Sequence, residues 1–401
     1  MRVLLSTIGS RGDVQPMVAL AMELKALHHE ARICAPPDFR EWVEGFGIPF
    51  FAIGPEVRST AKASPGANPA PPTPEQIRAM MEGTVVTQFE TVPDAAEGCD
   101  VIVAGNALQI AARSVAEMMG IRYVFVSYCP ATLPSPHHAP PAVMAWRPKD
   151  PNAPNTALWA EDAERWTKTW GPALNAQRTA RGLAPVTDVR DHILTRHPWL
   201  AADQALAPWV QPSDLDVFQP GAWIVRDTRP LSPEITAFLD AGSPPIYFGF
   251  GSIRAPHDIT RMMIDAARSL GRRAIVSRGW TDLTLPDDAP DCLLIGEVNQ
   301  QVLFERVAAV VHHGGAGTTH AAARAGVPQV VIPQHYDQPY FARRVDQLGI
   351  GVAHAQGSPT ADSLTTALAR ALESGARAQA RIVAVRMTDD GARRAARQLA
   401  E

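Results

Sequence analysis

Short apolar runs alternate with longer segments of helical period over most of the chain. Residues 3–8 form a largely apolar run, residues 15–27 carry apolar side chains at helical spacing, and a second largely apolar run follows at residues 31–35. Such runs are typical of strands buried on both faces, and the longer period is typical of a helix packed on a sheet. The pattern reads β-α-β and predicts a parallel sheet at the start of the chain.

The alternation lapses once, at residues 213–228, and then begins afresh. Further strands are expected at residues 101–104, 123–127, 246–250, 273–277, 292–295, 307–311 and 329–332, with helices between them such as 111–119 and 259–270. We therefore predict an α/β protein with two Rossmann-like domains, over residues 1–212 and 229–385, joined by a linker at 213–228. A C-terminal helix is expected within residues 386–401.

Two proline-rich stretches interrupt the first series of elements. Residues 55–74 show no clear period, and residues 130–154 follow the carboxyl end of an expected strand. Loops at that end of parallel strands often bind ligands, and the second stretch also carries His137, His138 and Trp146. We interpret it as a wall of a ligand site, with a plain solvated loop as the alternative. A helix is expected soon after it, at residues 162–177.

Residues 307–339 contain the strongest chemical pattern. An apolar run leads into HHGGAGTT at residues 312–319, an Ala-rich helix, a second apolar run and PQHYDQP at residues 333–339. Both polar loops follow strands, where ligands of open α/β sheets bind. Glycines allow the backbone to approach a ligand, and the helix N-terminus offers unpaired N–H groups to phosphate. The loop lacks a Walker A lysine and does not fit G-x-G-x-x-G, so a tight turn alone is the alternative.

Composition narrows the class of protein. The 401 residues exceed what one core usually serves, and 46% hydrophobic residues supply two cores. A net charge of -4 leaves no basic footprint for nucleic acid. The four cysteines show no C-x-x-C spacing, so neither a zinc site nor a disulfide framework is indicated. No segment approaches the ~20 apolar residues that span a bilayer, and we expect a cytoplasmic monomer.

The motifs resemble a known family over nearly the whole chain. HGGAGTT at residues 313–319, followed by PQ at 333–334 and DQP at 337–339, resembles the donor-binding signature of family 1 glycosyltransferases, which have the GT-B fold. GSRGDVQP at residues 9–16 resembles the bacterial branch with glycopeptide-antibiotic glycosyltransferases and, more distantly, sterol glucosyltransferases. Segments that resemble the glycopeptide enzymes in particular are CP at 129–130, PSP at 134–136, HPW at 197–199, AAD at 201–203 and GAWI at 221–224.

The resemblance implies two Rossmann-like domains whose parallel sheets face an interdomain cleft, with the last helix crossing back to the first domain. It implies an inverting, metal-independent hexosyltransferase that uses a UDP- or dTDP-sugar as co-substrate and needs no cofactor. The acceptor would be a hydroxyl of an aromatic or polycyclic natural product, with a glycopeptide aglycone as the leading suggestion. The alternatives are a sterol or lipid glucosyltransferase, a non-hydrolysing sugar-nucleotide epimerase of the same fold, and a non-catalytic auxiliary partner.

The resemblance also assigns donor-binding residues. They are Val298, His313, Gly315, Gly317, Thr318, Asp337 and Gln338. We add Ser252, which follows the first expected strand of the second domain, and Ser10, which shares the loop of Asp13, because both hydroxyls could donate to phosphate. His313, Thr318 and the backbone of the glycine loop are assigned to the diphosphate. Val298 is assigned to main-chain recognition of the base, although this chain lacks the tryptophan that plant members place near there. Asp337 and Gln338 are assigned to the sugar hydroxyls, and Asp337 is also counted as catalytic.

Asp13 is the candidate catalytic base. It lies in the first strand-to-helix loop, where many family members have histidine in H-V-N-P and this chain has DVQP. An ordinary Asp has a pKa of about 3.9 and is a poor base, but burial raises that pKa and a phenolic acceptor demands less. The alternative is that Asp13 only caps the helix over 15–27. The base would then lie among His137, His138 and their loop.

The pair Asp214 and Asp216 forms the D-x-D pattern that other nucleotide-sugar enzymes use for a metal. It follows Pro212 and Ser213 in the expected linker, away from the strand ends, so we interpret it as a turn. We predict no metal, because a helix N-terminus with His313 supplies the positive potential that a diphosphate requires.

Overall fold

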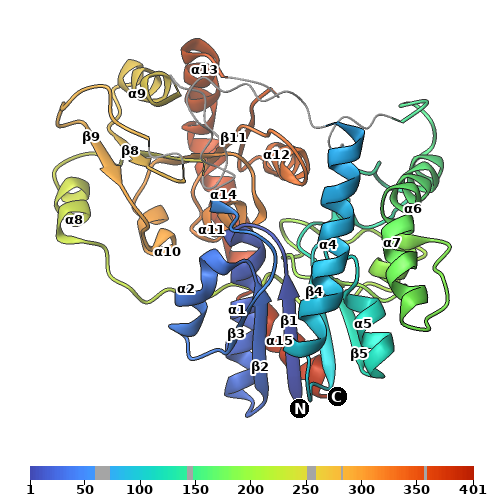
Figure 1. The fold of residues 1–401 in the computed structure, drawn as a ribbon. Helices are drawn as coiled ribbons and strands as arrows, with labels where there is room; N and C mark the ends of the chain where they lie inside the picture. The colour runs from blue at the N-terminus through green and yellow to red at the C-terminus, as the bar shows by residue number, and fades with distance from the viewer. Residues whose placement is uncertain (59–72, 142–147, 251–258, 281–282, 356–358) are drawn as a thin grey trace. The chain divides into compact units, whose positions relative to one another are not determined.

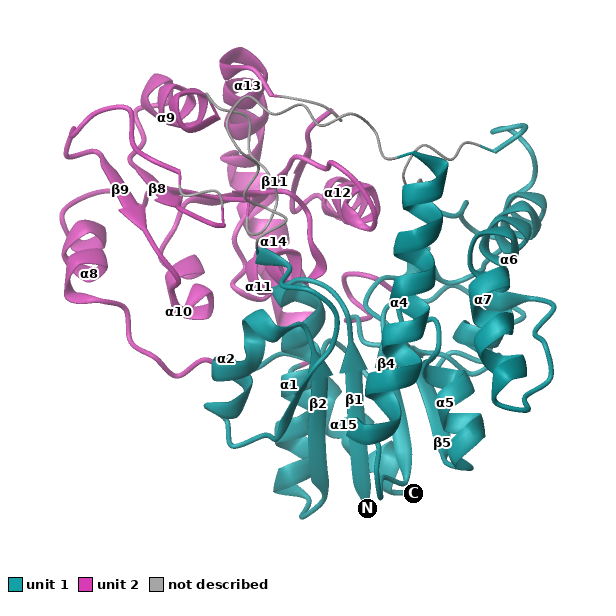
Figure 2. Cartoon of the chain, in the orientation of Figure 1, with its two compact units in different colours: residues 1–202, 209–225, 389–401 teal, residues 203–208, 226–388 magenta. Residues whose placement is uncertain are grey.

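The computed structural model describes residues 1–58, 73–141, 148–250, 259–280, 283–355 and 359–401 (Figure 1). The chain divides into two compact units (Figure 2). Unit 1 comprises residues 1–202, 209–225 and 389–401, and unit 2 comprises residues 203–208 and 226–388. No helix in these described ranges is long and apolar enough to cross a bilayer.

Unit 1 is built on a parallel sheet with the order β3-β2-β1-β4-β5-β6. Its strands are β1 (Arg2–Thr7), β2 (Glu30–Ala35), β3 (Phe50–Ala52), β4 (Val101–Gly105), β5 (Arg122–Ser127) and β6 (Trp199–Leu200). Its helices are α1 (Arg11–Ala26), α2 (Arg40–Glu44), α4 (Pro74–Ala95), α5 (Ala112–Met119), α6 (Asn155–Ala180), α7 (Val189–Leu194) and α15 (Gly391–Ala400). Single-turn 3₁₀ helices lie at Pro37–Phe39 and Pro130–Thr132.

Unit 2 repeats this plan with the order β12-β11-β10-β7-β8-β9, again parallel throughout. Its strands are β7 (Ile246–Gly249), β8 (Ala274–Ser277), β9 (Cys292–Ile295), β10 (Ala309–His312), β11 (Gln329–Val331) and β12 (Gly351–Ala353). Its helices are α8 (Pro233–Asp240), α9 (Ile259–Ser269), α10 (Gln300–Phe304), α11 (Ala316–Arg324), α12 (Gln338–Gln347), α13 (Ala361–Ala371) and α14 (Ser374–Arg386).

Both faces of the unit 2 sheet are buried, which explains why its strands are apolar without alternation. Phe248 and Val311 belong to one core cluster, which includes residues of α9 and α13. Their neighbours Tyr247 and Val310 belong to another cluster, which includes residues of α8, α10 and α11. Successive strand residues point to opposite faces, so one apolar run serves two cores. The predicted α/β class is confirmed.

Each sheet has one point where the strand order reverses. In unit 1 the chain begins at β1, adds β2 and β3 on one side, and adds β4 to β6 on the other. In unit 2 the first strand is β7, with β8 and β9 on one side and β10 to β12 on the other. Ligands of open α/β sheets bind beyond the carboxyl ends of the strands at such a switch point. The expected positions are therefore β1/β4 in unit 1 and β7/β10 in unit 2.

The unit boundaries differ from the linker expected at residues 213–228. Residues 209–225 belong to unit 1, where Phe218 forms a parallel bridge with Trp199 and packs against its ring. Residues 203–208 belong to unit 2, where the carbonyl of Leu206 accepts a hydrogen bond from Arg344 Nε (2.9 Å). An aperiodic segment can still be held by backbone pairing, which a search for hydrophobic period does not detect.

The end of the chain returns to unit 1. α15 packs against α1, with Arg393 Nε 3.1 Å from a carboxylate oxygen of Glu23. A Cβ on Gly391 would lie 2.5 Å from the carbonyl carbon of Gly221, so only glycine fits at the start of this helix. The chain re-enters unit 1 at residue 389, whereas the C-terminal segment was expected to begin at residue 386.

Two helices also differ from expectation. α4 lies in a stretch for which no element was expected, and it begins after Thr73, whose side chain accepts a hydrogen bond from Gln76 N. Only its second half buries side chains, so its apolar period is short. α6 is longer than the helix expected at residues 162–177, beginning directly after Pro154.

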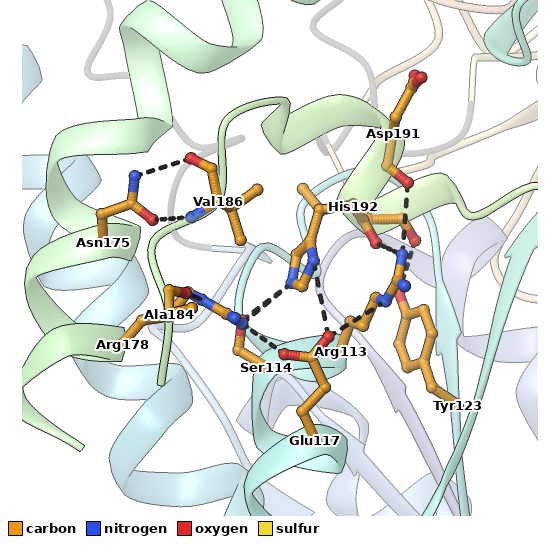
Figure 3. A network of polar contacts seen from close by, with 11 residues as sticks. Arg113, Ser114, Glu117, Tyr123, Asn175, Arg178, Ala184, Val186, Asp191 and His192 are labelled. Atoms are coloured by element: carbon orange, nitrogen blue, oxygen red, sulfur yellow. Dashed lines mark hydrogen bonds and ion pairs between the residues drawn. The ribbon is translucent and has the colours of Figure 1, made fainter. Parts of the chain in front are cut away.

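A polar network joins α5, α6 and α7 in unit 1 (Figure 3). Arg178 on α6 donates from Nη1 to Ser114 Oγ and to a carboxylate oxygen of Glu117, both at 2.7 Å. Ser114 Oγ lies 3.0 Å from His192 Nε2, and Arg113 donates to the His192 carbonyl (2.6 Å). Burial and the nearby Arg113 and Arg178 lower the pKa of His192 to about 4, against an opposing effect of Glu117. His192 is therefore neutral at pH 7.

Candidate active site

Asp13 lies at the switch point of unit 1, in the first turn of α1. The N-cap of α1 is Ser10, so Asp13 is the third helical residue and not the N-cap that the sequence suggested as its alternative role. The Asp13 Oδ2 atom accepts hydrogen bonds from Ser10 N (2.8 Å) and Ser10 Oγ (3.3 Å). This is the reciprocal bond of a capping box. A Cβ on Gly9 would overlap the Asp13 carboxylate, so the close approach requires glycine.

The second oxygen of Asp13 is held from another strand. Asn106, just beyond the carboxyl end of β4, donates from Nδ2 to Asp13 Oδ1 (3.0 Å). Burial raises the pKa of the Asp13 carboxyl above its ordinary value, and hydrogen bonds from Asn106 and Ser10 oppose this rise. The carboxylate is thus a stronger base than an exposed Asp, held in one orientation. Capping and general-base catalysis are compatible roles here.

The glycine loop lies at the switch point of unit 2, between β10 and α11. His312 is fully buried, with Nε2 2.9 Å from Gln329 Oε1, and its Nδ1 accepts a hydrogen bond from Gly314 N (3.0 Å). Burial lowers the pKa of His312 to about 4. Gly314 has φ +95°, and a Cβ there would lie 2.7 Å from Val331 Cγ1. His312 and Gly314 therefore set the shape of the loop.

The neighbouring His313 differs from His312 in its hydrogen bonds. Its Nε2 lies 2.5 Å from the place that a Cβ on Gly315 would occupy, over the N-terminus of α11. Its Nδ1 is buried and has no hydrogen-bond partner among the described residues. Burial, with smaller effects of His312 and His335, lowers the pKa of His313 to about 3. A buried polar atom without a partner costs free energy unless a ligand pairs with it.

The first turn of α11 follows the glycine loop directly. The N-cap is Gly315, which has no side chain to cap the helix. The first intrahelical bond runs from Thr319 N to Gly315 O (3.1 Å), so the N–H groups of Gly317 and Thr318 precede it. Gly317 is exposed and Thr318 is half-buried. The dipole and these N–H groups favour a phosphate at this end.

The loop before α12 adjoins the glycine loop. A Cβ on Gly314 would lie 3.2 Å from the Gln338 carbonyl oxygen. Gln338 is buried, and its Oε1 accepts hydrogen bonds from Gln334 N (2.8 Å) and His335 N (3.2 Å). The side-chain oxygen of Gln338 thus holds its own loop. Asp337 is half-buried at the N-cap of α12 but makes no side-chain capping bond.

The remaining donor-binding candidates are dispersed. Val298 is half-buried in the loop between β9 and α10 and packs against the second core cluster. The next residue, Asn299, caps α10 and donates to the carbonyls of Asp227 (3.0 Å) and Arg229 (2.8 Å). Ser10 lies beside Asp13 in unit 1, and Ser252 lies outside the described residues.

The alternative candidates for the base and for a metal site contact other groups. His137 Nε2 lies 2.9 Å from the Pro212 carbonyl oxygen, and His138 packs against the rings of Trp159 and Trp209. Asp216 pairs with His197, 3.1 Å away, at an exposed position. Within the described ranges, no three His, Cys, Asp or Glu side chains are grouped so as to hold a metal ion.

The chain is similar to proteins of known families. The glycosyltransferase family 28 N-terminal domain model matches residues 3–135, and the C-terminal domain model of erythromycin biosynthesis protein CIII-like proteins matches residues 265–398. The chain is 52% identical to glycosyltransferase GtfE of Amycolatopsis orientalis, over 99% of this chain and 96% of that protein. The chain belongs to the GT-B family 1 glycosyltransferases.

Two further relatives have more specific names. This glycosyltransferase is 50% identical to the vancomycin aglycone glucosyltransferase of Amycolatopsis orientalis, over 100% of this chain and 97% of the relative. It is 44% identical to the dTDP-epi-vancosaminyltransferase of the same organism, over 96% and 93%.

Solved structures share the fold of this glycosyltransferase. The kitacinnamycin glycosyltransferase aligns with TM-score 0.72 at 21% identity, covering 100% of this chain and 98% of that one. Spinosyn forosaminyltransferase SpnP aligns with TM-score 0.71 at 18% identity, covering 100% of both chains. Streptomyces glycosyltransferase SsfS6 was solved with thymidine diphosphate and aligns with TM-score 0.63 at 20% identity, over 100% and 99%.

Sequence reasoning missed several residues that bond to the candidate residues of both units. In unit 2, Gln329 bonds His312 from the neighbouring strand. In unit 1, Asn106 bonds Asp13, and the Tyr128 hydroxyl donates to the Asp13 carbonyl oxygen (3.2 Å). One signal was available for Asn106: it directly follows a buried strand, where the switch-point argument applies.

Proposed function

We propose that this glycosyltransferase moves a hexose from a dTDP- or UDP-sugar to a hydroxyl group of an aromatic or polycyclic natural product, with inversion and without a metal. The observation that carries the proposal is the buried Nδ1 atom of His313, which has no hydrogen-bond partner among the described residues, beside the N-terminus of α11, whose N-cap Gly315 has no side chain. That arrangement suits a nucleoside diphosphate, which carries its charge on oxygens that accept hydrogen bonds.

The proposed reaction is a single displacement. Asp13 Oδ1 takes the proton of the acceptor hydroxyl, and the resulting oxygen attacks the anomeric carbon. The bond between that carbon and the diphosphate oxygen breaks, so the electron pair leaves with the nucleoside diphosphate. His313 and the N–H groups of the first turn of α11 stabilise the departing charge. Because attack and departure occur on opposite sides of the carbon, the product has the opposite anomeric configuration.

The sugar is proposed to contact the loop before α12. Asp337 is half-buried at the N-cap of α12, and its carboxylate is the group proposed to accept hydrogen bonds from sugar hydroxyls. The side-chain oxygen of Gln338 already accepts two backbone hydrogen bonds, so its amide nitrogen is the group proposed to reach a hydroxyl. Main-chain atoms near Val298 are proposed to recognise the base, while Ser10 is proposed mainly as the partner of Asp13.

A glycopeptide aglycone is the proposed acceptor class. Relatives with 44–50% identity over nearly the full chain carry names that refer to the vancomycin aglycone and to epi-vancosamine. A phenolic hydroxyl on the acceptor would suit a carboxylate base, because a phenol has a pKa of about 10 and an aliphatic alcohol is far less acidic. A sterol or lipid acceptor is the second candidate, resting on the resemblance at residues 9–16 alone.

The experiment is incubation of the purified enzyme with panels of aglycones and nucleotide sugars, followed by mass spectrometry. We expect a mass increase of one hexose on a glycopeptide aglycone, and an inverted anomeric configuration by NMR. Conversion of the nucleotide sugar to its epimer without an acceptor would instead establish the epimerase alternative. Donor hydrolysis without any glycoside from either acceptor class would refute the proposed acceptors.

A further inference from the structure

Asn106 occupies an unusual backbone position beside Asp13. Its φ is +64°, in the left-handed region that non-glycine residues seldom adopt. It follows β4, whose last residue pairs with Thr7 at the end of β1, so Asn106 lies at the switch point of unit 1. The residue is half-buried. Its side chain therefore enters the polar site from the strand beside the one that leads to Asp13.

The orientation of the Asn106 amide is determined by its partners. Its Oδ1 accepts a hydrogen bond from Leu108 N (2.9 Å), and its Nδ2 donates to the Ile8 carbonyl oxygen (2.7 Å). A flipped amide would set the nitrogen against an N–H group and the oxygen against a carbonyl. The group that faces Asp13 Oδ1 at 3.0 Å is therefore the N–H donor.

This donor decides how the Asp13 carboxylate can act. Oδ2 already accepts two hydrogen bonds from Ser10 and packs against Gly9. From the part of the chain that the structure describes, Oδ1 accepts one, from Asn106, and a carboxylate oxygen has two lone pairs. Oδ1 is thus the oxygen with capacity for an acceptor proton, and the amide sets the direction of its remaining lone pair. The amide cannot accept a proton itself at this nitrogen.

We propose that Asn106 is the positioning residue of the catalytic base: its amide aims Asp13 Oδ1 at the acceptor hydroxyl and keeps the carboxylate ionised at working pH. The inference rests on the proposed function, because it requires Asp13 to be the base. The competing explanation is that Asn106 only shapes the β4–α5 turn through its bonds to Ile8 and Leu108.

Among the described residues, the polar groups beside Asp13 stay in one protonation state over the pH range of the test. Tyr128 contacts the Asp13 backbone, and burial together with Asp13 raises the pKa of its hydroxyl well above the ordinary value, so it stays neutral. Arg11 stacks over the Trp42 ring, with 3.5 Å from its guanidinium carbon to the ring centre. Ser10 and Asn106 do not titrate.

The test is turnover against pH for Asn106→Gly, which keeps the positive φ but removes the amide. Loss of a hydrogen bond to a carboxylate should move the acidic limb of the kcat profile upward by about 1–2 pH units. The affinity for dTDP or UDP, measured by calorimetry, should stay parental, because the groups proposed to bind the diphosphate, His313 and the first turn of α11, lie in unit 2. Tyr128→Phe is the matched control, since the Tyr128 hydroxyl bonds the Asp13 backbone carbonyl and Thr7 rather than the Asp13 carboxylate, so its loss should leave the acidic limb in place.

Asn106→Asp gives a second measurement, which also serves if the glycine variant folds poorly. It keeps an acceptor for Leu108 N but brings a second carboxyl group to Asp13, so the pair shares a proton and the acidic limb moves upward. An acidic limb at the parental pH in either variant, with activity lowered equally at every pH, would overturn the positioning role. Near-parental turnover of Asp13→Asn would instead refute the base assignment, so the two failures are distinguishable.

Discussion

Replacing His313 by alanine tests the proposed donor site at its most specific side chain. The His313 ring lies over the N-terminus of α11, with Nε2 2.5 Å from the place of a Gly315 Cβ. Its buried Nδ1 has no partner among the described residues. A diphosphate oxygen can therefore bind to Nδ1 without breaking a hydrogen bond between Nδ1 and another described residue. His313→Ala should weaken binding of both dTDP and UDP.

The expected magnitude follows from the charge of the two groups. Burial holds the pKa of His313 at about 3, so the ring binds as a neutral donor, while the diphosphate is an anionic acceptor. A hydrogen bond to a charged group contributes roughly 1.5–3 kcal/mol. Its loss should raise Kd by about 10- to 150-fold. Gly315→Ala should act in the same direction, because its Cβ displaces the ring while the histidine remains.

Isothermal titration calorimetry at pH 7 measures these affinities. Gly375→Ala is the matched control, since a Cβ on this helical glycine of α14 meets nothing within 4 Å. Its nucleotide affinity should be parental. Titrations in two buffers of different ionisation enthalpy report proton uptake on binding, and a neutral ring predicts the same uptake for the parent and His313→Ala.

Two results would contradict this reasoning. Parental affinity of His313→Ala for both nucleotides would remove His313 from the donor site. If the parent takes up a proton on binding and His313→Ala does not, the ring binds as a cation. The loss of nucleotide affinity would then come from an ion pair and not from a neutral hydrogen bond. Thermal melting of the ligand-free variants shows whether they are folded at the assay temperature. A loss of nucleotide affinity counts only for a folded variant.

Three other predictions concern the base, the metal and the polar network. Asp13→Asn should lower turnover by about 10²–10⁴ while nucleotide affinity stays parental, and more acidic phenols should restore part of it; near-parental turnover would direct attention to His137 and His138. Turnover should survive EDTA, and a loss that Mg²⁺ or Mn²⁺ restores would reopen Asp214 and Asp216. The pKa of His192 is lowered to about 4, whereas the unfolded chain takes up this proton near pH 6.5, so the free energy of unfolding should fall from about pH 6.5 toward pH 4. His192→Gln should flatten that fall in denaturant titrations, by at most about 3 kcal/mol at pH 4, and an equal slope in parent and variant would refute the neutral buried ring.

The pattern of hydrophobic residues alone was sufficient to predict where most of the strands lie. The expected runs at residues 101–104 and 123–127 correspond to β4 and β5, because a strand covered on both faces is apolar at nearly every position. The glycine loop was also readable, since strand, glycines and helix follow one another within one short segment. The same reasoning failed for α4, whose buried side chains lie only in its second half.

The positions of the two sites within their sheets depended on strand order, which no local pattern encodes. Asn106 is 93 residues from Asp13 in the chain and reaches its carboxylate only because β4 pairs with β1. Likewise, Gln329 bonds His312 because β11 lies beside β10. Local sequence determined which segments became strands, loops and helix N-termini, because period and glycine placement act over a few residues. Tertiary structure alone decided which polar side chains meet, because hydrogen-bond partners are set by the pairing of distant strands.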